Sequence, residues 1–82
     1  MPDAFKRFAA MKRNPRNEWT IGDVLSFCVN SGLHCHPPSR GSHYVVSHPA
    51  IDGLLTLPAT TPIKPIYIML LVEMAEAVLE LA

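Results

Sequence analysis

The 82-residue chain predicts a small α+β domain, because helical and strand-like patterns occupy separate parts of it. Two helical segments come first, and three short strand-like runs follow at 33–36, 43–47 and 54–57. The runs are joined by "PPSRG" and "PAIDG", which are turn-rich and short enough for antiparallel neighbours. A further helix closes the chain. We therefore expect a three-stranded antiparallel sheet with helices on one face.

The two N-terminal helices are indicated by their ends and by their apolar spacing. In "PDAFKRFAAMKRN", Pro2 suits a first helical position, and apolar residues follow at helical spacing until "NPRN" ends the segment. The second helix has clearer signals. Thr20 and Asp23 form a capping pair before an apolar stripe, and Gly32 supplies the stop. We expect this helix over residues 20–31.

Alternation along the strands sorts their side chains into two faces. The face expected to meet the helices consists of Leu33, Cys35, Tyr44, Val46, Leu55 and Leu57. The opposite, open face is expected to carry His34, His36, His43, Val45, Ser47 and Thr56. Three of the four histidines are thus predicted on the open face.

The last helix, from Pro65 to about Leu81, is unusually apolar. Its only charges are Glu73, Glu76 and Glu80, which form one narrow stripe. A three-stranded sheet cannot cover so much of a helix circumference. The sequence therefore predicts a homo-oligomer that forms through this C-terminal helix.

Charge is unevenly distributed in a chain of zero net charge. Residues 1–16 hold five basic side chains and one acid, a net charge of +4, and the remainder is −4. Two interpretations stay open: an anionic partner for this end, or a solvated basic helix face. We divide the chain into a basic helix and connector, residues 1–16, and a domain, residues 17–82.

The apolar segments do not predict a membrane protein. The N-terminus lacks the apolar core of a signal peptide, and "IYIMLLV" is too short to cross a bilayer. Cys28 and Cys35 do not form a disulfide framework. We expect a cytoplasmic location and no membrane partner.

The histidines and cysteines raise two further alternatives. "HCH" puts His34 and His36 on one face, with His43 on the next strand, and three imidazoles could hold zinc. No carboxylate or short paired ligand spacing accompanies them, so we expect no metal and no other cofactor. Cys28 and Cys35 face the core in this pattern and are not expected to be nucleophiles.

The stretch "RGSHY" and its surroundings resemble a known family. Gly41-Ser42-His43-Tyr44, followed by His48-Pro49, "LTLP" and "IKPIYI", is similar to the HicA toxin ribonucleases of bacterial HicA–HicB toxin–antitoxin systems. Upstream, "NPRNEWTIGDVLSFCVNSGL" is similar to the first part of that family. The resemblance covers roughly residues 14–72.

The resemblance implies a fold similar to double-stranded-RNA-binding domains, α-β-β-β-α, here preceded by a short extra helix. It also implies metal-independent cleavage of mRNA and silencing by a HicB-like antitoxin protein. His43 matches the active-site histidine of the family, which lies early in the second strand.

The residues around His43 suit this chemistry. The ordinary pKa of an imidazole is about 6.5, so it can take or give a proton at neutral pH. Gly41 has no side chain to keep a phosphate from the backbone. Arg40 and Lys64 are the cations expected to bind phosphate and stabilise its transition state. Ser42 is expected to orient the backbone or His43.

Two interpretations compete with a nuclease. His43 could be an exposed strand histidine that hydrogen-bonds to water, and the chain could be a non-catalytic RNA- or protein-binding module. The acidic domain body favours the non-catalytic module over a nuclease. Affinity for RNA comes mostly from neutralised phosphates, and an acidic body neutralises few of them. His48 and Trp19 are expected to serve as a turn residue and a core anchor, respectively.

Overall fold

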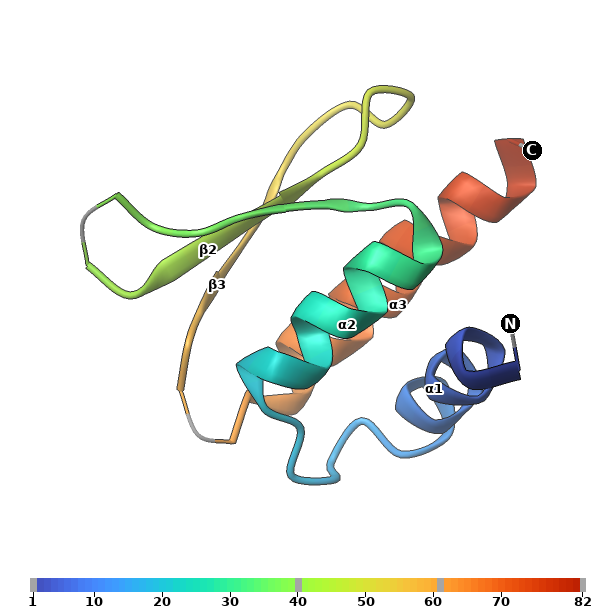
Figure 1. Cartoon of the computed structure of the whole chain (residues 1–82), viewed down its shortest axis with the longest axis horizontal. Helices are drawn as coiled ribbons and strands as arrows, with labels where there is room; N and C mark the ends of the chain where they lie inside the picture. Colours follow the sequence, from blue (N-terminus) through green and yellow to red (C-terminus); the bar gives the residue numbers. More distant parts are fainter. Residues whose placement is uncertain (1, 40, 61, 82) are drawn as a thin grey trace.

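The computed structural model describes residues 2–39, 41–60 and 62–81. Its elements follow the order α1-α2-β1-β2-β3-α3 (Figure 1). Their bounds are Pro2–Arg13 for α1, Ile21–Ser31 for α2, His34–His36 for β1, His43–Ser47 for β2, Leu55–Pro58 for β3 and Pro65–Leu81 for α3. The predicted α+β class is confirmed, with one antiparallel sheet in the order β1-β2-β3.

Two strands begin one residue later than the sequence predicts, and both shifts have a local cause. The backbone N–H of Leu33 donates to the carbonyl of Cys28 at 3.0 Å, so Leu33 takes part in the C-terminal cap of α2 and not in the strand ladder. At β3, the register ends with Val46 opposite Leu55, which leaves Leu54 outside the strand and 69% exposed.

Helix α2 has the ends that its sequence predicts. The backbone N–H of Asp23 donates to Thr20 Oγ1 at 3.2 Å, and the backbone N–H of Thr20 donates to Asp23 Oδ2 at 2.9 Å. This reciprocal pair satisfies donors that the first helical turn leaves open. Gly32 ends the helix in the left-handed region with φ at 79°.

The three helices lie on one side of the sheet (Figure 1). Helix α2 contacts β1, α3 contacts β3, and α1 packs against α2 and α3. The predicted faces are confirmed: Val46 and Leu57 are fully buried, whereas the four side chains exposed on the open face are His34, His36, His43 and Thr56.

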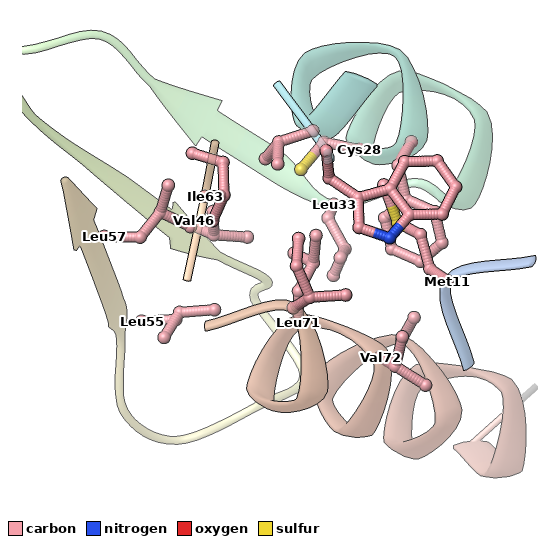
Figure 2. Packing of buried hydrophobic residues seen from close by; sticks show 14 residues of the cluster. Met11, Cys28, Leu33, Val46, Leu55, Leu57, Ile63, Leu71 and Val72 are labelled. Atoms are coloured by element: carbon pink, nitrogen blue, oxygen red, sulfur yellow. The ribbon is translucent and has the colours of Figure 1, made fainter. Parts of the chain in front are cut away.

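The core is a single apolar cluster between the sheet and the helices (Figure 2). All three helices contribute, and Met11 of α1 is as deeply buried as Val24, Leu57 and Leu71. The full set of buried residues is Met11, Trp19, Val24, Phe27, Cys28, Leu33, Val46, Leu55, Leu57, Ile63, Ile68, Leu71, Val72 and Ala75. Helix α1 therefore completes the same core as the strands.

Trp19 fixes the connector between α1 and α2. Its indole Nε1–H donates to the carbonyl of Asn14 at 2.9 Å, and its own carbonyl accepts from the backbone N–H of Ile63 at 2.8 Å. The side chain is only 9% exposed. The predicted role of Trp19 as a core anchor is confirmed.

Helix α3 combines a buried side with an exposed apolar side. Ile68, Leu71 and Val72 are buried, whereas Ile66 is 53% and Met69 48% exposed. Among the described residues, no helix is both long enough and apolar enough to cross a membrane.

Replacing Met11 by Ala should destabilise the protein by about 2–5 kcal/mol, because the change leaves a cavity among α1, α2 and α3. Urea denaturation measures the loss. Arg13→Ala, on the exposed side of the same helix, is the matched control and should stay within about 0.5 kcal/mol of the parent protein. Equal stabilities for the two variants would show that α1 is not part of the cooperative core.

Candidate functional site

The candidate site lies at the mouth of the β1–β2 hairpin, where the chain turns between the two strands. His43 is the first residue of β2, and its side chain is exposed on the open face. It lies opposite Pro58 in the β2–β3 register. The backbone N–H of Ala59 donates to the carbonyl of Ser42 at 2.9 Å, which ties the start of β2 to the end of β3. The imidazole is thus presented to solvent from a fixed backbone.

Gly41 has a backbone conformation that favours glycine. Its φ is 74°, in the left-handed region where a side chain is disfavoured. A Cβ built at this position meets no described atom within 4 Å, apart from Gly41 itself and its two chain neighbours. The space beside Gly41 is therefore open, and the need for glycine comes from the turn.

The other residues expected at the site occupy different positions. The side chain of Ser42 is exposed and makes no hydrogen bond to His43, so the contact that holds this end of β2 is through the Ser42 backbone. Lys64 is exposed just before α3, and its carbonyl accepts from the backbone N–H of Tyr67 at 3.0 Å. Within the described residues, no hydrogen bond or ion pair joins Lys64 to His43. Arg40 lies outside the described residues.

Three of the four histidines form a row along β1 and the turn after β2. The ring centroids of His34 and His36 are 6.4 Å apart, and those of His34 and His48 are also 6.4 Å apart, in an edge-to-face arrangement. The Nε2 atom of His36 lies 3.3 Å from the hydroxyl of Ser47. This row was not predicted, although the "HCH" spacing placed two of its members on one face.

His48 is held by the turn that it begins. Its Nδ1 accepts from the backbone N–H of Ala50 at 3.0 Å, and its carbonyl accepts from the N–H of Ile51 at 3.0 Å. The predicted role as a turn residue is confirmed. Across the described ranges, no group of three or more histidine, cysteine or acidic side chains is arranged to hold a metal ion.

The two cysteines lie on the opposite side of the sheet from the candidate site. Cys28 of α2 is buried, and Cys35 of β1 is half-buried beside it. Burial raises the pKa of the Cys28 thiol to about 12, and Cys35 adds to the increase. Burial also raises the pKa of Cys35, although its hydrogen bond with Cys28 acts in the other direction. Both thiols are therefore protonated at neutral pH and poor nucleophiles.

Comparisons of the chain with protein-family models, with curated proteins and with solved structures found no match. The likeness to HicA toxins therefore stays a prediction drawn from the quoted motifs.

The free energy of unfolding should fall as the pH rises from about 9 toward 12. Below pH 9 the Cys28 thiol is protonated in both states; above it the unfolded chain releases this proton while the folded protein retains it. The Cys28 thiol should lower the free energy of unfolding by up to about 1.4 kcal/mol per pH unit, in addition to the contributions of other titrating groups. Urea denaturation of the parent protein and of Cys28→Ala over this range isolates the contribution. Parallel pH dependences in the two proteins would contradict the prediction.

Proposed function

We propose that the protein is a HicA-like endoribonuclease toxin that cleaves mRNA, with His43 as its general acid and base. The proposal places the protein in the bacterial cytoplasm, with a HicB-like antitoxin as its partner. It needs no metal or other cofactor, because the ribose 2′-hydroxyl of the substrate serves as the nucleophile. The motif around His43 is the origin of the proposal.

The observation that carries the proposal is the exposure of His43 beside Gly41. The imidazole stands on the open face, away from the packed aliphatic side chains. Apart from Gly41 and its two chain neighbours, no described atom lies within 4 Å of the position where Gly41 lacks a Cβ. A phosphodiester therefore has space to approach both the ring and the backbone. A ring packed into the core would have ruled this chemistry out.

The proposed reaction is an internal transesterification. The imidazole of His43 removes the proton from the ribose 2′-hydroxyl, and the 2′-oxygen then forms a bond to the adjacent phosphorus. The bond from phosphorus to the 5′-oxygen of the next nucleotide breaks, and a proton from the imidazolium or from water completes the leaving hydroxyl. The products are a 2′,3′-cyclic phosphate and a 5′-hydroxyl. Proton transfer of this kind contributes roughly 10²–10⁴-fold to a rate.

The phosphate ligands of the proposal are Arg40, Gly41, Ser42 and Lys64. Gly41 and Ser42 lie immediately before His43 and are both exposed. Lys64 is exposed at the start of α3, after the segment that leads from β3. Cations near the reacting phosphate would stabilise the charge that builds up in its transition state.

Replacing His43 by Ala should lower RNA cleavage by roughly 10²–10⁴-fold and abolish growth arrest, because the proton acceptor is lost. Induction of each protein in a bacterial host, with transcript integrity followed over time, gives the measurement. Purified proteins and a defined RNA give the rate.

The matched control is Asn30→Ala, which removes an exposed polar side chain from α2, on the helical side of the sheet. Its cleavage should exceed that of His43→Ala by at least tenfold, and circular dichroism should show both variants folded. Undiminished cleavage by His43→Ala would refute the proposed function.

A second candidate function is a non-catalytic binding module. It is favoured by the exposed apolar side of α3, which has no part in the nuclease chemistry. Parent protein that binds RNA or a protein partner but leaves RNA intact at high concentration would select this function.

For either function, we propose that two copies associate through α3. Ile66, Met69 and Leu70 lie three and four residues apart, on one side of the helix, and are 53%, 48% and 39% exposed. Antiparallel pairing of two such helices around Met69 and Leu70 buries these side chains. It also brings Lys64 of each copy toward Glu73 of the other, so the charges at the ends of the contact are complementary.

Leu70→Glu should convert the associated form into a monomer, because it places two like charges near the twofold axis. Sedimentation or light scattering across a concentration series measures the mass. Val29→Glu, at an apolar position of α2 that is 80% exposed, is the control and should keep the association of the parent protein. A parent protein whose mass is that of a monomer at every concentration would contradict this proposal.

A further inference from the structure

The open face of the sheet differs from the rest of the molecule in its charge. The chain has seven acidic residues, and none belongs to a strand. Asp23 lies on α2, and Glu73, Glu76 and Glu80 lie on α3; these two helices cover the other face. The remaining three are Asp3 of α1, Glu18 of the α1–α2 connector and Asp52 of the β2–β3 turn. Most of the acidic side chains, which weaken an RNA-binding interpretation, therefore lie in the helical layer and not on the open face of the sheet.

The open face carries exposed aromatic rings and no acidic side chain from the strands. His34 and His36 are exposed neighbours on β1, with ring centroids 6.4 Å apart and planes inclined by 41°. His34 is supported from the side by the edge-to-face ring of His48, which the backbone N–H of Ala50 holds in place. Imidazole rings are among the side chains on which unpaired bases stack. His34 thus has a ring contact on one side, and His36 has a polar contact with Ser47.

The register places this pair next to the candidate catalytic residue. His36 lies opposite Val45 on β2, and His43 is the next residue along β2 on the same face. His36 and His43 are therefore diagonal neighbours on adjacent strands, and the His36 ring itself contacts Ser47 on the other diagonal. Both also border the hairpin loop that contains Gly41.

We propose that the open sheet face is a platform for single-stranded RNA, on which bases stack against His34 and His36 and a flanking phosphodiester reaches His43. This inference rests on the proposed function for the role of His43, and it adds the substrate class and the surface that binds it. Thr56 and Ser47 supply hydroxyls on the same face.

Single strands fit this surface better than duplexes do. The faces of paired bases are stacked within a helix and are not available to side chains, whereas single strands can splay their bases onto aromatic rings. Duplex recognition relies instead on contacts to phosphates and 2′-hydroxyls along the grooves, and none of the strands carries a lysine or arginine for such contacts. Three strands about 4.8 Å apart offer room for only a few nucleotides.

The test measures RNA binding separately from cleavage. Proteins carrying His43→Ala are used so that the RNA stays intact, and fluorescence anisotropy follows a short labelled single strand and the same strand in a duplex. Adding His34→Ala and His36→Ala should weaken single-strand binding by about tenfold or more, since each stacked base contributes substantially to affinity. His34→Phe with His36→Phe should restore it, because the rings are kept.

The rival surface is the basic connector, which Arg13→Gln with Arg16→Gln tests in the same background. The platform proposal would be overturned if the Arg13→Gln, Arg16→Gln protein lost RNA binding while the His34→Ala, His36→Ala protein kept it. Equal affinity for the single strand and the duplex would also overturn it. A parent protein that binds single strands through the histidine pair but cleaves no RNA would refute the proposed function and leave the platform standing. Circular dichroism on each variant separates lost binding from lost folding.

Discussion

The burial of Val46 in the central strand is the constraint on which the rest of the structure depends. Val46 is fully buried, and it lies between Cys35 of β1 and Leu55 of β3 in the two registers. Side chains alternate along a strand, so residues an odd number of positions from Val46 point away from the helices. His43 is three positions away and is exposed for this reason. A slip of one residue in pairing would bury the imidazole and expose the valine.

One ion pair within the molecule partly neutralises the basic N-terminal segment against the acidic C-terminal helix. Helix α1 packs against α3, and Lys12 forms an ion pair with Glu76. The basic N-terminal segment is thus folded back onto the helix that carries the acidic stripe. Lys12 is exposed and Glu76 is half-buried, so solvent screens the pair and it adds little stability, but it lowers the positive charge that α1 can offer to an anion. The basic end and the acidic body are therefore less independent than the sequence suggests.

Local patterns predicted most of the fold, because they depend on neighbours in the chain. The capping pair at Thr20 and Asp23, the glycine stop at Gly32 and the alternation in β2 are all short-range, and each is present as expected. The strand starts were off by one residue because alternation does not reveal where the end of α2 or the last ladder pair lies. The burial of Met11 depends on how three helices meet, which no local pattern contains.

The candidate site was predicted less completely than the fold. Exposure of His43 follows from alternation, and the open space at Gly41 follows from its turn. The contact between His34 and His48 depends on a turn hydrogen bond that bends His48 back over β1, and alternation gives no sign of it. Lys64 follows a loop whose path is set by contacts with Trp19, so its position relative to His43 could not be derived from spacing.

The sheet is also limited at both of its edges. β1 has three residues and runs into Pro37 and Pro38, and β3 has four residues and ends at Pro58. Proline has no N–H to donate, and edges this short offer few ladder positions to a passing chain. Strand addition, the usual route by which small sheets merge and aggregate, is disfavoured on either side. The two edges of the sheet therefore offer little backbone to which a second chain could pair.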